Sequence, residues 1–314
     1  MAVKKKPLKL KALSPAAQAA IKDKKLEGSD SFKNWQKCLA ELEAFDAHRG
    51  ALYRRADSQI GMYILLAFLW IFGGILASVL GGIFLGQAGL LLIAGAVVLL
   101  VVLIVMAVVN SKRASRLKAA DLSDDFSLCL IPFLDELAED CDPKAKVRLK
   151  LNLSGLTDPK VLSKRGLPTP AGRPGQVYEF VYQDPWCHLA LPLNDGNIIT
   201  MDLKNYVIKQ VRSWHNARGK PKSKAKWRKT VIAVASLAPG QSEAAWDPTK
   251  LDRQPEQGKL RLADKKGAKV ARLVKKWKFK CINFEPNDPV PVEELMGMFM
   301  QLYALLKPAA GTGT

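Results

Sequence analysis

The sequence predicts an α+β membrane protein. A two-helix transmembrane hairpin with flanking amphipathic helices is followed by a C-terminal antiparallel β-sandwich or barrel, closed by one helix. Three observations predict this fold class. The 50 residues of 60–109 include no Lys, Arg, Asp, Glu or His. Apolar residues at helical spacing lie on both sides of that stretch. From residue 143 onward, apolar residues instead alternate with polar ones, as in half-buried strands.

The stretch 60–109 is too long for one membrane span. A single helix of that length would measure about 75 Å at about 1.5 Å per residue, whereas the hydrocarbon core is about 30 Å thick. We therefore expect two spans, about 60–84 and 88–109, joined by a turn at the Gly-Gln-Ala-Gly sequence of 86–89. The alternative is a buried hairpin in a soluble core, which is disfavoured because helices of soluble proteins keep a polar stripe.

Basic residues predict the orientation of this hairpin. The tip between the spans carries no charge, whereas basic residues flank both spans: Arg49, Arg54, Arg55, Lys112, Arg113, Arg116 and Lys118. By the positive-inside rule, both termini are expected in the cytoplasm, and we expect an integral protein of a bacterial inner membrane. The five cysteines are widely spaced and form no Cys-x-x-Cys pair, which fits a reducing compartment.

Helical segments are expected on both sides of the spans. Residues 1–13 are interpreted as a basic disordered tail, and residues 14–59 as cytoplasmic helices with an apolar face that begins at Phe32. Residues 110–142 are expected to form post-membrane helices, kinked or restarted at Pro132. The helices before and after the spans are expected to pair with each other.

Residues 143–307 are expected to form the β-rich domain, with a flexible tail at 308–314. The Asn-Asp-Gly-Asn sequence at 194–197 is a strong hairpin signal, and 183–186 is interpreted as another turn. The closing helix would be capped by Asp288. The expected strands are 146–153, 177–182, 187–193, 198–203, 206–214, 229–237, 259–263 and 269–282.

Basic residues dominate two parts of this domain. Residues 204–229 hold ten basic residues and no acidic one, and 259–280 hold ten basic residues against Asp264 alone. The segment 218–226 is interpreted as an exposed, flexible loop between two tryptophans. The residues predicted to bind lipid or another polyanion are Lys209, Arg212, Arg218, Lys220, Lys222, Lys224, Lys226, Arg228, Lys229, Trp214 and Trp227.

Several partners fit this basic set besides the bilayer that holds the hairpin. Near a membrane surface, each Lys or Arg contributes roughly 1 kcal/mol of attraction to anionic lipid, and tryptophan favours the interface. An acidic protein is a second partner. Nucleic acid, bound through its phosphates with stacking on tryptophan, is a weaker alternative. The simplest interpretation is a solvated surface that binds nothing.

Small residues recur every four positions in the first span. The stripe consists of Gly74, Ser78, Gly82 and Gly86, and it would let another helix backbone approach closely. Packing against the second span of the same hairpin is the simpler use of such a stripe. Association between copies of the chain, giving a homo-oligomer, is the other.

The sequence offers no catalytic motif, no cofactor motif and no metal-ligand spacing. It has three histidines, and Cys187 and His188 are neighbours, which on a strand point to opposite sides. A metal site from Cys187, His215 and Cys281 would require the fold to bring them together. No catalytic residue is therefore assigned, and enzyme activity is disfavoured.

These observations favour a membrane-anchored cytoplasmic binding or scaffold module, whose basic β-domain engages an acidic partner or an anionic lipid surface. The alternative is an oligomerising membrane effector that perturbs the bilayer through its glycine-rich hairpin.

Overall fold

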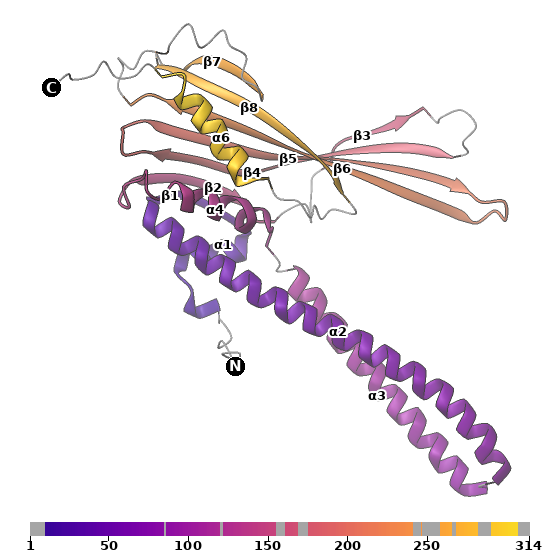
Figure 1. The fold of residues 1–314 in the computed structure, drawn as a ribbon. Helices are drawn as coiled ribbons and strands as arrows, with labels where there is room; N and C mark the ends of the chain where they lie inside the picture. The colour runs from indigo at the N-terminus through magenta and orange to yellow at the C-terminus, as the bar shows by residue number, and fades with distance from the viewer. Residues whose placement is uncertain are drawn as a thin grey trace. The chain divides into compact units, whose positions relative to one another are not determined.

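The computed structural model describes residues 10–84, 86–119, 122–154, 161–168, 175–240, 246, 258–265, 268–281 and 290–306. The chain divides into two compact units (Figure 1). The helical unit contains residues 43–121, and the sheet unit contains residues 11–42 and those from 122 onward. The helical unit is therefore an insertion in the sheet unit, whose residues lie before and after it in the sequence.

Two long helices, α2 (Phe32–Phe84) and α3 (Gly86–Ala119), form the hairpin that the sequence predicts. Since α2 ends at Phe84 and α3 begins at Gly86, the boundary between them lies next to the expected turn. The N-terminal amphipathic helix and the first apolar segment were expected as separate elements, but α2 runs through both without interruption. No proline lies between Phe32 and Phe84, and isolated glycines such as Gly50 cost only about 1 kcal/mol in a helix.

Within the helical unit, large apolar side chains are exposed along the described parts of 62–72 and 97–109, whereas Phe45 near the start of the unit is buried. Ala56, Asn110 and Ala114 are buried, where α2 and α3 run antiparallel (Figure 1). Both helices are long and apolar enough to cross a membrane. Their exposed large apolar side chains include Met62, Ile64, Leu65, Phe68, Leu69, Trp70, Ile71, Phe72, Val97, Val98, Val101, Val102, Ile104, Val105, Met106, Val108 and Val109.

The sheet unit contains one eight-stranded antiparallel sheet in the order β1-β2-β4-β5-β6-β8-β7, with β3 paired to β4. The sheet is open, so the described strands form no closed barrel, and the α+β class is confirmed. The strands are β1 (Lys25–Ser31), β2 (Lys146–Asn152), β3 (Val161–Leu167), β4 (Gln176–Pro192), β5 (Ile198–His215), β6 (Pro221–Ala238), β7 (Lys259–Lys265) and β8 (Ala268–Cys281).

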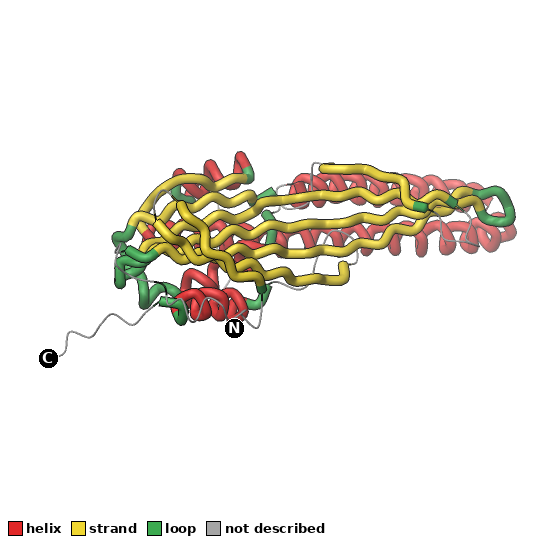
Figure 2. The backbone as a smooth tube through the Cα atoms, turned by 90° about the horizontal axis from the view of Figure 1, so that it is seen from above, coloured by secondary structure: helices red, strands yellow, loops and turns green. Residues whose placement is uncertain are grey.

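Three strands are longer than the sequence indicated. β4 continues through the expected turn at 183–186, where the pairing register shifts between Pro185 and Cys187 as a bulge that accommodates the proline. β5 joins the two segments expected at 198–203 and 206–214. β6 begins at Pro221, so most of the expected loop at 218–226 is strand. Figure 2 shows the long strands of the antiparallel sheet side by side, in yellow. The turn itself is confined to Asn216–Lys220.

Helices cover one face of the sheet, which we call the core face. Leu149, Leu189, Met201 and Leu273 point to this face and are almost completely buried. Glu294 of α6 pairs there with Lys275 of β8. The covering elements are α1 (Pro15–Asp23), the first turns of α2, the π-helical η2 (Phe126–Leu130), α4 (Ile131–Glu136) and α6 (Val292–Tyr303); the short η1 (Leu10–Ala12) precedes α1.

The closing helix is confirmed as α6, although it begins at Val292 after Pro291 as its N-cap. The expected cap, Asp288, lies outside the described residues. Restarting of the helix at Pro132 is confirmed, since Pro132 lies in the first turn of α4. Phe133 of α4 then packs on Phe299 of α6, with 5.6 Å between ring centroids, which joins two covering helices.

Replacing Phe133 with alanine should lower the free energy of unfolding by about 3–5 kcal/mol, because the ring is fully buried. Thermal unfolding of the detergent-solubilised full chain, followed by circular dichroism, measures the loss. Leu128→Ala is the matched control, since Leu128 lies on η2 with half of its surface exposed and should change stability by less than about 0.5 kcal/mol. Equal losses in both variants would contradict this packing.

Candidate functional site: the basic outer face of the sheet

The strand register places most of the predicted basic residues on one surface. We call the side opposite the core face the outer face. Directly paired residues of antiparallel strands point to the same side, and so do residues two apart on one strand. Arg212 pairs with Lys224, Trp214 with Lys222, and Gln210 with Lys226. The outer row, as we call it, consists of Arg212, Lys222, Lys224, Lys226 and Arg228.

The outer row is accessible. Its four β6 residues are exposed and Arg212 is half-buried beside Trp214, with the guanidinium carbon 5.2 Å from the ring centroid. Successive row members on β6 are about 7 Å apart, since a strand rises about 3.3–3.4 Å per residue. Arg218 and Lys220 lie in the exposed turn at the end of this hairpin. The row and the turn form one strip of positive charge.

Like charges face each other directly on the outer face. Arg212 opposes Lys224 across β5 and β6, and Arg261 opposes Arg272 across β7 and β8. Opposed like charges destabilise a sheet, by an amount similar to the roughly 0.2–1 kcal/mol that a favourable cross-strand pair contributes. This arrangement therefore does not serve the stability of the isolated fold.

One buried carboxylate, Glu179, lies on the outer face and pairs with a neighbouring cation. Glu179 of β4 accepts hydrogen bonds from Gln210 (Nε2 to Oε2, 2.9 Å) and from Arg165 (Nε to Oε1, 2.7 Å). These hydrogen bonds hold the pKa of Glu179 below its usual range, and the bond from Gln210 has the largest effect. Arg165 comes from β3, which sequence patterning did not reveal. The carboxylate is already engaged and leaves the outer row with a large positive excess.

Three predicted residues lie on the other side of the sheet. Trp227 stacks on Tyr182 with 6.4 Å between ring centroids, and Lys209 lies over Trp227 with its ammonium nitrogen 4.5 Å from the ring centroid. Both belong to the core face, where Val207 and Phe180 complete an apolar cluster. Lys229 lies on that face too. The eleven predicted residues therefore divide between two faces and a turn.

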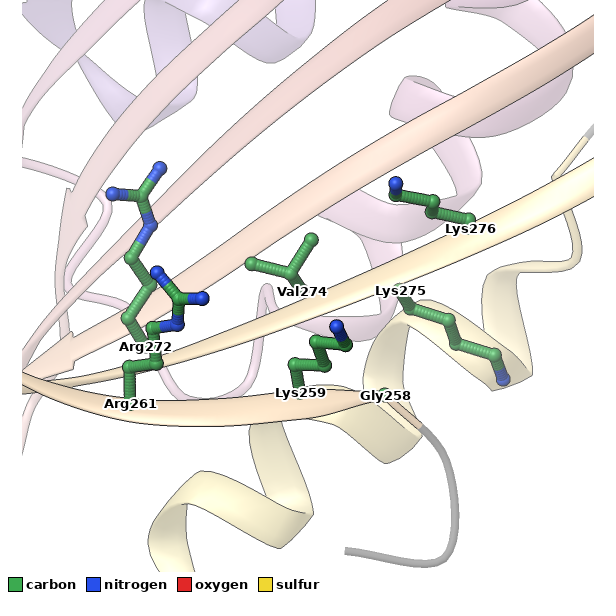
Figure 3. Close-up of a pocket in the computed structure, with 7 residues that line it drawn as sticks. All are labelled: Gly258, Lys259, Arg261, Arg272, Val274, Lys275 and Lys276. Carbon is green, nitrogen blue, oxygen red and sulfur yellow. The ribbon is translucent and has the colours of Figure 1, made fainter.

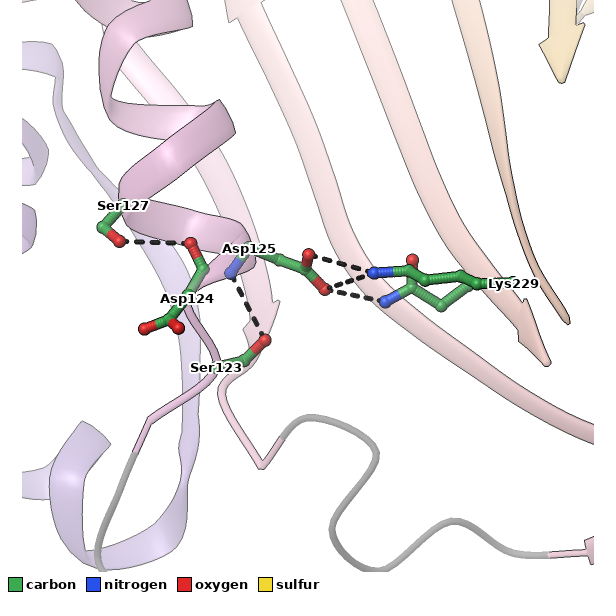
Figure 4. A network of polar contacts seen from close by, with 6 residues as sticks. Ser123, Asp124, Asp125, Ser127 and Lys229 are labelled. Atoms are coloured by element: carbon green, nitrogen blue, oxygen red, sulfur yellow. Dashed lines mark hydrogen bonds and ion pairs between the residues drawn. The ribbon is translucent and has the colours of Figure 1, made fainter. Parts of the chain in front are cut away.

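Lys229 is buried, unlike the other predicted cations. Only 2% of its side chain is exposed, and its ammonium donates to Asp125 Oδ1 at 3.1 Å. Figure 4 shows this contact between Lys229 and Asp125. Asn205 Nδ2 also donates to Asp125, at 2.8 Å to Oδ2. Because Asp125 immediately precedes η2, this pair fixes the start of that helix to the sheet. Lys229 therefore has a structural contact that a surface-binding residue does not need.

A second buried carboxyl lies beside this pair. Asp184, which pairs with Asn205 across the strands, accepts a hydrogen bond from Asn152 Nδ2 to Oδ1 at 2.7 Å. Within the described residues, its Oδ2 and the Oδ1 of Asn205 are buried without a hydrogen-bond partner. Burial raises the pKa of Asp184 to about 6. The nearby thiol of Cys129 is also held protonated, since burial raises its pKa to about 12.

The residues considered for a metal site do not converge. Cys187 pairs with Leu203, and His215 lies at the far end of the same strand β5, about 40 Å from Leu203 at about 3.3 Å per residue. His188 Nδ1 instead lies 2.8 Å from Asp202 Oδ1. In the described part of the chain, no group of three His, Cys, Asp or Glu residues is arranged to hold a metal ion.

The small-residue stripe of the first span includes Gly74, Ser78, Gly82 and Gly86. Its surroundings lie outside the described side chains, so neither use of the stripe is tested.

Comparisons with protein-family models, with curated proteins and with solved structures gave no match.

Lys229→Ala should lower the free energy of unfolding by about 3–5 kcal/mol, because it leaves the partly buried Asp125 carboxylate without its ion-pair partner. Chemical denaturation of the full chain measures the loss. Lys226→Ala, three residues away on the exposed face, should change it by less than about 0.5 kcal/mol. If Lys229→Ala leaves the free energy of unfolding unchanged, the buried ion pair makes no net contribution to stability.

Asp184→Asn should change how stability depends on pH. The folded pKa of Asp184, about 6, lies above its ordinary value of 3.8, so its protonated form stabilises the fold at low pH and this contribution is lost as pH rises through about 6. The asparagine variant should be about 1–3 kcal/mol more stable than the native chain near pH 8, with a smaller advantage near pH 5. Parallel denaturation curves at both pH values measure this, and an unchanged difference would refute it.

Proposed function

We propose that this protein is a membrane-anchored cytoplasmic binding module. In this proposal, the α2–α3 hairpin crosses the bilayer twice, both termini lie in the cytoplasm, and the outer face of the sheet binds anionic lipid headgroups. The single observation that carries the binding proposal is the outer row, five cations on one exposed sheet face with like charges opposed.

Exposure of the hairpin supports the anchor. Soluble monomers rarely expose contiguous apolar patches of more than a few hundred Å². Here large apolar side chains are exposed along both helices, from Met62 to Phe72 and from Val97 to Val109. The basic residues that flank the two spans support a cytoplasmic location for both helix ends.

The geometry of the outer row favours a plane of charges as the partner. Row members repeat along an extended strand, so they present positive charge over a length of about 20 Å along β6. Each can contribute roughly 1 kcal/mol near an anionic leaflet. Trp214 lies on the same face, and its amphipathic ring suits the interface between headgroups and water. Binding of an acidic protein or a nucleic acid uses the same charges without needing this planar repeat.

The alternative function is an oligomerising membrane effector, and no contact among the described residues supports it. It depends on the glycine stripe, whose surroundings lie outside the described side chains.

Vesicle capture tests the binding proposal with the full chain reconstituted in phosphatidylcholine nanodiscs. We expect vesicles that contain phosphatidylserine to capture these nanodiscs, pure phosphatidylcholine vesicles to capture few, and added salt to weaken capture. Replacing Lys222, Lys224 and Lys226 together with glutamine should weaken capture by about tenfold or more.

A matched variant controls for net charge. Replacing Lys22, Lys33 and Lys37 with glutamine removes three exposed cations from the helices and should leave capture nearly unchanged. Equal capture by neutral and anionic vesicles, or equal losses in the two triple variants, would contradict a binding surface on the outer face.

A further inference from the structure

A cavity of about 820 Å³ lies on the sheet where β7 pairs with β8 (Figure 3). Its β8 residues pair with residues 232–236 of β6, away from the outer row. Five cations line it: Lys259 and Arg261 from β7, and Arg272, Lys275 and Lys276 from β8. The described lining residues include no carboxylate and no aromatic ring. The site is therefore both strongly positive and large enough for a small molecule, since such sites usually measure about 300–1,000 Å³.

The register explains why these cations gather. Arg261 and Arg272 are directly opposed, so they point to the same side of the sheet. Val274 pairs with Lys259, and Lys276 lies two residues beyond Val274 on the same face. The intervening Lys275 points the other way (Figure 3) and pairs with Glu294 of α6. The other four lining cations form no ion pair with another described residue.

The first residue of the cavity is a glycine for a steric reason. Gly258 has a backbone φ of +107°, a conformation that residues other than glycine rarely adopt. A Cβ atom at this position would lie 2.7 Å from the carbonyl oxygen of Val274. The chain therefore approaches β8 closely as it begins β7, and this approach sets Lys259 and Arg261 against the neighbouring strand.

We propose that this cavity binds a non-aromatic ligand with several phosphate groups, such as a polyphosphorylated cyclitol, either free or as a lipid headgroup. Arginine presents donors in a planar fork that matches phosphate, and two opposed arginines can hold adjacent phosphates. A ligand with several phosphates, bound between Arg261 and Arg272, would attract both guanidinium groups and offset their repulsion. The described lining offers no ring for a base to stack on, which favours a cyclitol over a nucleotide.

This site is independent of the outer row, because different strands and different residues form it. Binding of phosphatidylserine surfaces by the row and binding of a polyphosphate by the cavity can therefore succeed or fail separately.

Calorimetry with inositol hexakisphosphate as the probe tests the site, using the full chain in phosphatidylcholine nanodiscs. We expect saturable binding that Arg261→Gln/Arg272→Gln weakens by about tenfold or more, while Lys224→Gln/Lys226→Gln changes it by less than about threefold. Removing the opposed charges should also leave the thermal unfolding temperature unchanged or raise it. Lys276→Gln, a single change in the same cavity, should weaken binding by a smaller factor and provides a second variant.

Vesicles then identify the source of the ligand. Stronger capture by phosphatidylinositol bisphosphate than by phosphatidylserine at equal charge, lost in Arg261→Gln/Arg272→Gln, indicates a lipid headgroup. Binding of the soluble probe without that preference indicates a free polyphosphate. No saturable binding, unchanged binding in both cavity variants, or equal losses in the cavity and outer-row pairs would each overturn the proposal.

Discussion

The continuous pairing of β5 and β6 is the constraint on which the rest of the sheet unit depends. One register runs from Ile198–Ala238 at one end of the β5–β6 ladder to His215–Pro221 at the other. In antiparallel strands such a register assigns every side chain to a face, and a slip of one residue would exchange the faces. It places Lys222, Lys224 and Lys226 outside and Lys229 inside. The division between the outer row and the core thus follows from the ladder.

The buried polar pairs secure this ladder where the core ends. Lys229 and Asp125 connect β6 to the start of η2, and Asn205 on β5 joins the same carboxylate. Buried pairs of this kind cost desolvation energy and are weak evidence for added stability, but removing one partner is strongly destabilising. Their value lies in register, because a shifted strand would leave Asp125 and Lys229 unpaired. Repulsion between cations on the outer face is tolerated because contacts on the core face determine how the strands pair.

Sequence patterns revealed the hairpin, most strands and the closing helix, because long apolar stretches and alternation are local signals. The strand β1 was missed since only Leu26 in it is buried, and β3 lies between glycine- and proline-rich stretches. Lys222, Lys224, Lys226 and Arg228 repeat every two residues, a strand signal that their charge concealed by suggesting a loop. Burial of Lys229 was out of reach, because its partner Asp125 is 104 residues away. The pairing of Arg261 with Arg272 likewise required the register.

One chain carries both the apolar hairpin and the basic sheet, and this linkage changes what the sheet must achieve. Tethering makes a second contact intramolecular, with an effective concentration that can reach the millimolar range. In the proposed function, the outer row therefore needs only weak attraction for each headgroup, which exposed lysines at about 7 Å intervals can supply. A soluble ligand gains nothing from the tether, so a cavity that binds one must supply its own affinity. Opposed arginines in the cavity and spaced lysines on the row are the arrangements that these two demands favour.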